Sequence, residues 1–302
     1  MAVLPGQGGP ILVTGGAGQL ASSLVACGGP RIHRVGRPEF DFDRPETITE
    51  TFGRVAPAAV VNAAAWTAVD AAEADPDGAA RANRDGPALL ARLCGQAGIP
   101  LIHVSTDYVF DGDKGAPYVE TDPISPTGVY GRTKAEGEQA VLAACPRAVV
   151  LRTSWVYSAT GKNFVRTMVN AGAKNPVLRV VGDQCGAPTS ADDLAAAIVD
   201  ILSLIETGGW KNAYAGIYHA AGTGETTWHG LAVAALQAAA RHGRTMPEVI
   251  AIRTADWPTP AKRPADSRLD CSKLERVFGI RLPAWHRSLP PTVDRLLAAS
   301  SP

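Results

Sequence analysis

Residues 11–21 read ILVTGGAGQLA, a short apolar run that leads into a glycine-rich turn and then into a helical pattern. The turn satisfies both the GxGxxG/A spacing (Gly16, Gly18, Ala21) and the wider GxxGxxG/A spacing (Gly15, Gly18, Ala21). Glycines let the backbone turn sharply, and the free N–H groups and dipole of the following helix favour a pyrophosphate. Because the pattern follows a strand and precedes a helix, it predicts dinucleotide binding. The alternative is a tight strand–helix turn that binds nothing.

Short apolar runs alternate with helical patterns through the first half of the chain. Buried parallel strands are expected at Ile11–Thr14, Ile32–Val35, Ala58–Asn62, Leu101–Ser105 and Ala148–Arg152. Helices are expected near Leu20–Cys27, Ala79–Ala97 and Thr133–Ala144. Because parallel strands need crossovers, this alternation predicts an α/β fold with a Rossmann-type, doubly wound parallel sheet of about seven strands.

The rhythm becomes irregular after Tyr157, and only Ile217–Ala221 is expected to return to the sheet as a strand. We therefore predict two domains. The dinucleotide-binding domain comprises residues 1–157 plus about 190–221. The smaller, mostly C-terminal substrate-binding domain comprises about 158–189 plus 222–302.

Composition excludes several classes of function. Hydrophobic residues make up 46% of the 302 residues, which is enough for a sizeable core. Lys plus Arg and Asp plus Glu both number 29, so the chain lacks the excess positive charge of most proteins that bind nucleic acids or membrane surfaces. The five cysteines form no CxxC pair, and no histidine motif predicts a metal site. With no secretory signal and no long apolar segment, a cytoplasmic protein is expected.

The residues after the second expected strand bear on the choice of cofactor. An NAD enzyme usually places Asp or Glu about 20 residues after the glycine turn, to hold the ribose hydroxyls. Here the strand around Ile32–Val35 is followed by Gly36 and Arg37, with no acid. A guanidinium suits a 2′-phosphate through bidentate bonds. Arg37 therefore predicts a preference for NADPH, while use of NADH stays open; the alternative is an exposed loop arginine.

Three residues together predict proton transfer to a carbonyl oxygen. Thr106 follows the expected strand 101–105, and ligands of open α/β sheets bind beyond the carboxyl ends of strands. Tyr130 and Lys134 are four residues apart and share a helix face. The Lys134 ammonium is expected to lower the pKa of Tyr130 towards working pH. Tyr130 can then donate a proton as hydride reaches the carbonyl carbon, and Thr106 can polarise the oxygen.

In combination these motifs resemble the extended short-chain dehydrogenase/reductases and, more narrowly, the dTDP-4-dehydrorhamnose reductase family. The resemblance covers nearly the whole chain and is carried by the glycine turn, Asp41-Phe42, NAAAWTAVD (62–70), STDYVF (105–110), YGRTK (130–134), RTSWVY (152–157), DQCGAPT (183–189) and the segment 263–269. It implies NADPH-dependent reduction of the 4-keto group of dTDP-4-dehydro-β-L-rhamnose to dTDP-L-rhamnose, the last step of dTDP-rhamnose biosynthesis.

The resemblance also implies roles for individual residues. The catalytic set would be Thr106, Tyr130 and Lys134, with Tyr130 as proton donor and Lys134 also holding the nicotinamide ribose. The cofactor would contact Gly15, Gly18, Gln19, Leu20, Asp41, Phe42, Ala64, Ala65 and Trp66, with Asp41 and Phe42 beside the adenine. The substrate would contact Thr106, Asp107, Tyr130, Trp155 and Asn163.

The chain departs from the family at one position that matters for assembly. Ser23 stands where some members carry a glutamate that helps to hold magnesium at a dimer interface. Magnesium prefers carboxylate oxygens and water, so Ser23 argues against a magnesium site, and both a monomer and a homodimer stay open.

Two other functions stay open at this point. One is a non-catalytic, NADP-binding regulatory subunit of the methionine adenosyltransferase type. The other is a different nucleotide-sugar enzyme, an epimerase or dehydratase with tightly held NAD. The intact set of Thr106, Tyr130 and Lys134 favours a reductase.

Overall fold

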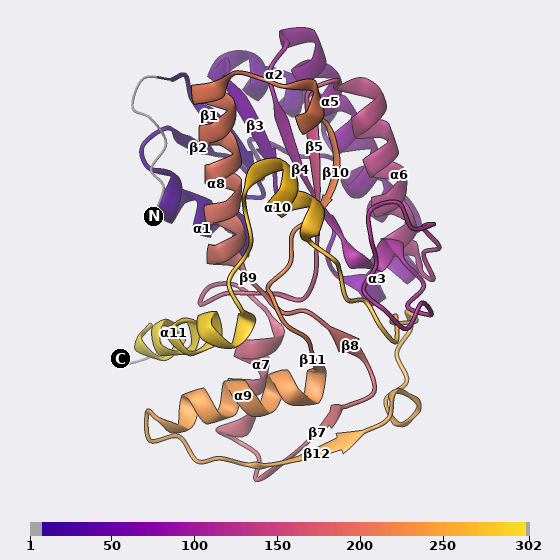
Figure 1. Ribbon diagram of the computed structural model, residues 1–302, viewed down its shortest axis with the longest axis vertical. Coiled ribbons are helices and arrows are strands. Elements are labelled where there is room, and N and C mark those ends of the chain that lie inside the picture. The colour runs from indigo at the N-terminus through magenta and orange to yellow at the C-terminus, as the bar shows by residue number, and fades with distance from the viewer. Residues whose placement is uncertain (1–7, 300–302) are drawn as a thin grey trace.

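The computed structural model describes residues 8–299, and its largest element is a six-stranded parallel sheet (Figure 1). The strand order is β10-β5-β4-β3-β1-β2. The strands are β1 (Ile11–Thr14), β2 (Ile32–Arg34), β3 (Ala59–Asn62), β4 (Leu101–Thr106), β5 (Ala148–Thr153) and β10 (Gly216–His219). The chain winds one way from β1 to β2 and the other way from β3 to β5. This reversal places a topological switch point, where ligands of such sheets bind, between β1 and β3.

Helices cover both faces of the sheet, as expected for buried parallel strands. One face carries α1 (Gln19–Gly28), α8 (Ala191–Gly208) and α10 (Ser272–Phe278), and the other carries α2 (Pro45–Val55), α5 (Gly86–Ala97) and α6 (Val129–Ala144). Alternate strand residues supply the two cores, so Ile11 and Val13 face α1 and α8, while Leu12 faces the α5 side. The predicted doubly wound α/β fold is confirmed.

The sheet has six strands rather than about seven, because the chain leaves it after β5. Residues Val156–Tyr157 form β6, which pairs with β9 (Thr189–Ser190) as a separate two-stranded ribbon. The chain returns through α8, and β10 then pairs directly with β5. The helix predicted at Ala79–Ala97 begins earlier, as α4 (Pro76–Ala80), and runs through a π-helical turn (Arg81–Asp85) into α5.

The remaining elements gather below the carboxyl ends of the strands in Figure 1. The helices α7 (Phe164–Gly172), α9 (Trp228–Ala240) and α11 (Trp285–Ala298) enclose a separate apolar core. Two ribbons lie beside them: β7 (Val177–Val181) with β12 (Glu248–Ile252), and β8 (Cys185–Gly186) with β11 (Thr226–Thr227). The short helix α3 (Val69–Ala74) precedes α4 at the same end of the sheet.

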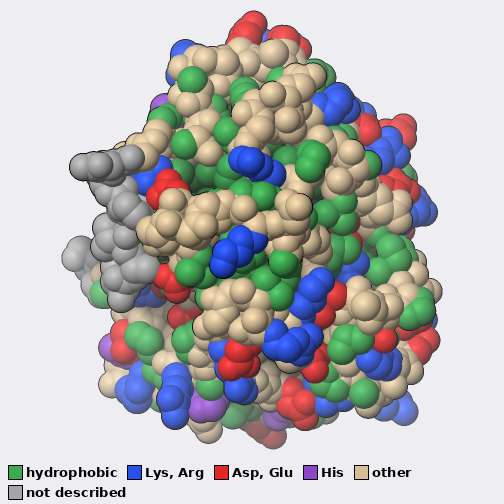
Figure 2. All heavy atoms as spheres, turned by 45° about the horizontal axis from the view of Figure 1, so that its top comes forward, with side chains coloured by type: hydrophobic (Ala, Val, Ile, Leu, Met, Phe, Trp, Pro, Cys, Tyr) green, Lys and Arg blue, Asp and Glu red, His purple; other side chains and the backbone are tan. Residues whose placement is uncertain are grey.

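Charges of both signs are interspersed on the face seen in Figure 2, in keeping with equal totals of basic and acidic residues. Within residues 8–299, no helix is both long and apolar enough to cross a membrane.

Candidate active site

A cavity of about 1070 Å³ lies at the carboxyl ends of β1, β3, β4 and β5. Its walls contain every residue predicted for the site except Asp41: Gly15, Gly18, Gln19, Leu20, Arg37, Phe42, Ala64, Ala65, Trp66, Thr106, Asp107, Tyr130, Lys134, Trp155 and Asn163. Residues that are distant in the sequence therefore meet in one hollow, at the place where the strand order reverses.

The glycine turn forms one wall of this cavity. Gly15 has φ +108°, a conformation that strains L-residues, and a Cβ at this position would lie only 3.0 Å from the carbonyl oxygen of Ala63. Gly18 precedes α1 and offers no side-chain cap, and the first turn of that helix has no acidic residue. The first amides of α1 are thus free of a side-chain acceptor, and the helix dipole adds positive potential where an anion would bind. This geometry fits a pyrophosphate.

Arg37 lies at the rim, exposed over 66% of its side chain, and is held by two carboxylates. Its Nε donates to Asp41 over 2.9 Å and its Nη2 donates to Asp43 over 2.8 Å. Asp41 does not line the cavity but acts on it through Arg37, whereas the Phe42 ring is part of the wall. Arg81, which sequence reasoning missed, also lines the cavity and pairs with Asp43. Arg81 lies shortly before α5 in the sequence and belongs to no motif that could have indicated its role.

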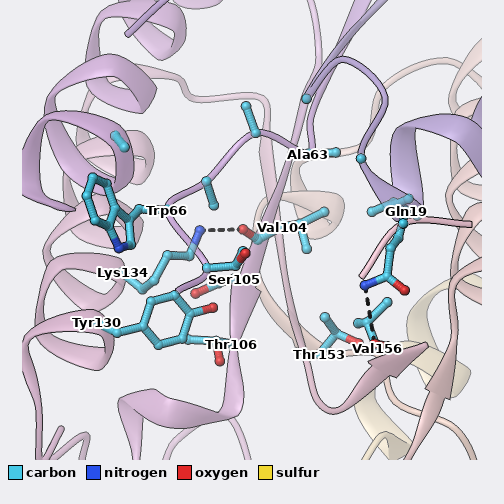
Figure 3. Close-up of a pocket in the computed structure, with 18 of the residues that line it drawn as sticks. Gln19, Ala63, Trp66, Val104, Ser105, Thr106, Tyr130, Lys134, Thr153 and Val156 are labelled. Carbon is cyan, nitrogen blue, oxygen red and sulfur yellow. Dashed lines mark hydrogen bonds between the residues drawn. The ribbon is translucent and has the colours of Figure 1, made fainter. Parts of the chain in front are cut away.

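The three residues predicted to be catalytic converge from β4 and α6 (Figure 3). Thr106 ends β4, while Tyr130 and Lys134 lie one turn apart on α6. The Lys134 ammonium is 1% exposed and donates to the carbonyl oxygen of Val104 over 2.7 Å. The Tyr130 and Thr106 hydroxyls lie next to one another beneath it, and Gln19 faces them from across the cavity.

Burial sets the protonation states of this group. It raises the pKa of Tyr130 to about 12, against a smaller lowering by the hydrogen bond with Thr106. The expectation that Lys134 lowers the pKa of Tyr130 is wrong here, because the ammonium is directed to the Val104 carbonyl and loss of water penalises the phenolate. Burial also lowers the pKa of Lys134 to about 8 and raises that of Asp107 to about 6.

Aromatic side chains form the wall nearest the C-terminal helices. Trp155, with φ +47°, stacks on Trp228 at a ring separation of 3.6 Å and an interplanar angle of 9°. Trp228 begins α9, whose N-cap is Thr227, and it was not predicted as a site residue. Asn163 uses its amide within its own loop, accepting from Arg166 N and donating to Ser158 O. It contributes to the wall while holding the start of α7.

A second cavity of about 360 Å³ adjoins the first, and Trp228 lines both. It is lined by aromatic and basic side chains among others, including Trp257, Arg179 and Arg263. The Arg263 guanidinium forms a bidentate pair with Asp70, at 2.5 and 2.7 Å, and this pair joins α3 to the loop that precedes α10. Arg268 is paired with Asp266 and Glu225.

Ser23 is buried beside α8, and its hydroxyl donates to Asp192 over 2.6 Å. In the part of the chain that the structure describes, no group of three or more His, Cys, Asp or Glu side chains is arranged to hold a metal ion. That Ser23 disfavours a magnesium site stays a prediction.

A glycine turn at the switch point of a parallel sheet, facing a Tyr and a Lys from one helix, defines a dinucleotide-binding oxidoreductase of the extended short-chain dehydrogenase/reductase class. A family model described as the RmlD substrate binding domain matches residues 9–298. The dTDP-4-dehydrorhamnose reductase of Sinorhizobium fredii is 45% identical over 289 residues, covering 95% of this chain and 97% of the relative. The chain belongs to the dTDP-4-dehydrorhamnose reductase family.

Solved structures agree with this assignment. A dTDP-4-dehydrorhamnose reductase from Clostridium acetobutylicum superimposes with a TM-score of 0.86 at 34% identity, over 95% of this chain and 99% of that one. A dTDP-4-dehydrorhamnose reductase from Bacillus anthracis, solved in complex with NADP, gives a TM-score of 0.86 at 30% identity, with the same coverage of both chains.

Proposed function

We propose that this protein catalyses the NADPH-dependent reduction of the 4-keto group of dTDP-4-dehydro-β-L-rhamnose to dTDP-L-rhamnose. The observation that carries the proposal is the meeting of Thr106, Tyr130 and Lys134 with the glycine turn in one cavity. A reductase needs a place for a dinucleotide and a proton donor beside it, and this cavity provides both. Its volume of about 1070 Å³ is at the upper end of ordinary ligand sites.

NADPH supplies hydride to the sugar carbon when it is bound. Tyr130, neutral at pH 7, donates its phenolic proton to the carbonyl oxygen, which becomes the product hydroxyl. Thr106 donates a hydrogen bond to the same oxygen and so stabilises the negative charge that develops there. The Lys134 ammonium would hold the nicotinamide ribose, and the phenolate left on Tyr130 would regain its proton from solvent.

Selectivity for NADPH is proposed to come from two guanidinium groups at the rim. Arg37 and Arg81 are both bound to Asp43, so a shared carboxylate orients them before any ligand arrives. A 2′-phosphate offers more acceptor oxygens than ribose hydroxyls do and suits paired guanidinium groups. NADH fits the same cavity without this contact.

The nucleotide end of the substrate is proposed to occupy the second cavity. Trp155 and Asp107 line the first cavity, where the sugar would meet Tyr130, and Trp228 joins the two. Trp257, which is 57% exposed, offers a ring face for the thymine base. Arg179 and Arg263 offer positive charge for the diphosphate.

One incubation separates the reductase from the alternatives. The purified protein is mixed with NADPH and with dTDP-4-dehydro-β-L-rhamnose generated in place, and NADPH absorbance and product mass are followed. A reductase consumes one NADPH for each sugar that gains two mass units. A regulatory subunit binds NADPH without consuming it, and an epimerase or dehydratase converts the sugar without net loss of NADPH. Either of these results would overturn the proposal. Cytoplasmic location and the choice between monomer and homodimer stay predictions.

A further inference from the structure

Behind the catalytic face lies a buried ion pair that the proposed mechanism does not use. Glu138 follows Lys134 by one turn of α6 and is 1% exposed, and Arg152 of β5 is 2% exposed. The Arg152 guanidinium donates to both carboxylate oxygens of Glu138, over 2.9 Å from Nε and 2.7 Å from Nη2. The Ser105 hydroxyl of β4 also donates to this carboxylate. Glu138 therefore joins α6 to two strands at once.

These contacts fix α6 in register with the end of β4. Three consecutive residues of the strand each meet one α6 side chain. The Val104 carbonyl accepts from Lys134, Ser105 donates to Glu138, and the Thr106 hydroxyl, which donates to Asp107, lies next to the Tyr130 hydroxyl. A shift of α6 by a fraction of a turn would break all three contacts. Glu138 is the member of this set that also reaches the next strand.

Glu138 also contributes charge. Titratable groups from the two neighbouring strands and from α6 itself face this part of the helix: His103 and Asp107 from β4 and its end, Arg152 from β5, and Tyr130 and Glu138. Elsewhere on α6, Glu73 of α3 accepts from Val129 N, and Arg84 of the π-helical turn donates to Glu136. Burial holds the pKa of His103 well below its usual range, so this ring is neutral. The Glu138 carboxylate raises the pKa of Lys134 and so opposes the larger lowering by burial. Residues i and i+4 of a helix are neighbours, which makes this interaction direct.

We propose that Glu138 is a positioning residue of the reduction, whose carboxylate seats α6 on β4 and β5 and supplies the negative charge that keeps Lys134 an ammonium beside Tyr130. The role of Glu138 in the reduction rests on the proposed function. The charge relation between Glu138 and Lys134 is a property of the protein alone. It can be measured without the sugar.

The test follows the titration of Lys134 directly. The chain has seven lysines, so ¹³C NMR of lysine Cε resolves a small set of signals, and Lys134→Arg assigns the one that is lost. In Glu138→Gln we expect the midpoint of Lys134 to fall by about one pH unit. Because that change leaves Arg152 buried without a partner, Glu138→Gln/Arg152→Gln is made as well, which removes both charges. In the double variant the midpoint falls less, but in the same direction.

The matched control is Glu136→Gln, which removes the same charge from the same helix. Glu136 is on the outer side of α6, with 37% of its side chain exposed, and pairs with Arg84 and Arg132. Solvent screens it, so the Lys134 midpoint should move by less than about 0.2 pH unit. A Glu136→Gln shift as large as that of Glu138→Gln would overturn the proposal.

Kinetics then separate positioning from simple anchoring. In Glu138→Gln, kcat should fall about tenfold at pH 8.5 and much less at pH 6.5, where Lys134 stays protonated, with little change in KM for the sugar. Ser105→Ala, which changes no charge, should lower kcat about threefold at both pH values without moving the midpoint. A lower melting temperature with an unmoved Lys134 midpoint, or an unchanged kcat in Ser105→Ala, would overturn the proposal. A shifted midpoint in a protein that reduces no sugar would count against the proposed function instead.

Discussion

Tyr130 and Lys134 work in opposite protonation states because burial acts on them in opposite directions. Loss of water disfavours the charged form of each, so it raises the pKa of the phenol to about 12 and lowers that of the ammonium to about 8. At pH 7 the phenol is a neutral proton donor, and most of the lysine is a cation. A donor to a carbonyl oxygen has to carry its proton before the reaction, so the raised pKa suits reduction.

The pH dependence of activity follows from Lys134. The amine is cationic below about pH 8 and neutral above it, so the proposed contact of the ammonium with the nicotinamide ribose would weaken as pH rises through that value. We expect kcat/KM for NADPH to fall about tenfold per pH unit above this midpoint. The measurement is a rate profile from pH 6 to 10, together with NADPH affinity by fluorescence titration. A profile that stays flat to pH 9.5 would contradict this role.

Arg37 is predicted to discriminate between the two nicotinamide cofactors. Arg37→Ala removes hydrogen bonds to a charged 2′-phosphate, and we expect KM for NADPH to rise about tenfold while KM for NADH stays within about twofold. The control is Arg44→Ala, because Arg44 is another exposed arginine of the same segment and pairs with Glu46 instead. Steady-state kinetics with both cofactors give the result. Equal effects on NADPH and NADH would show that Arg37 only holds its loop.

At the scale of elements, the pair between Asp70 and Arg263 joins α3 to the loop that borders the second cavity. Asp70 is 41% exposed at its side chain, and Arg263 holds its pKa below the usual range. A pair this exposed contributes little to stability, so Asp70→Asn should cost less than about 1 kcal/mol. Its larger effect should be on the loop, and we expect KM for the nucleotide sugar to rise several-fold with NADPH affinity unchanged.

Asp77→Asn is the control for Asp70→Asn, because Asp77 is an exposed carboxylate of the next helix, α4. Melting curves and steady-state kinetics with both substrates are the measurements. If NADPH affinity weakened as much as sugar binding, the second cavity would not be the place of the nucleotide.

The elements differ in how well the sequence predicts them. β1, β3, β4 and β5 are runs of apolar residues with 0–5% exposure at nearly every position, and their predicted bounds agree with the structure to within one residue. β7 and β12 mix exposed and half-buried positions and pair only with each other, so no periodicity marks them. The sheet has the six strands whose ranges were predicted, and the seventh of the expected number had no residues assigned to it.

The site residues likewise divide into those that the sequence predicts and those that it does not. Thr106, Tyr130 and Lys134 belong to motifs with fixed spacing, and all three line the first cavity. Arg81 and Trp228 reach that cavity through long-range packing, on Asp43 and on Trp155 respectively. The residues adjacent to Arg81 and Trp228 in the sequence do not predict these contacts. The sequence could not predict the raised pKa of Tyr130 either, because the burial that causes it depends on the whole fold.

At the scale of the whole molecule, the surroundings of Ser23 bear on assembly. Ser23 donates to Asp192, which itself is bound to Arg295, so the position beside α1 is occupied by contacts within the chain. A hydroxyl is a poor ligand for magnesium. We expect activity and molecular mass in solution to be unchanged when a chelator replaces magnesium, as measured by enzyme assay and by light scattering after size exclusion. A mass that halves on chelation would refute this expectation.

The zero net charge of the chain is also compatible with the binding of anionic ligands. A protein that binds two diphosphate groups needs positive potential only where they lie. The start of α1 is proposed to supply it for one, and Arg179 with Arg263 for the other. Equal totals of basic and acidic residues over the whole chain are compatible with that arrangement.

The central claim is that Tyr130 donates the proton, and the most direct measurement compares Tyr130→Phe with the unaltered protein. Phenylalanine keeps the ring and its packing against Tyr108 but has no proton to give. We predict that the variant folds, binds NADPH with unchanged affinity by fluorescence titration, and reduces the keto sugar at least about 100-fold more slowly. Reduction at the rate of the unaltered protein would contradict the account.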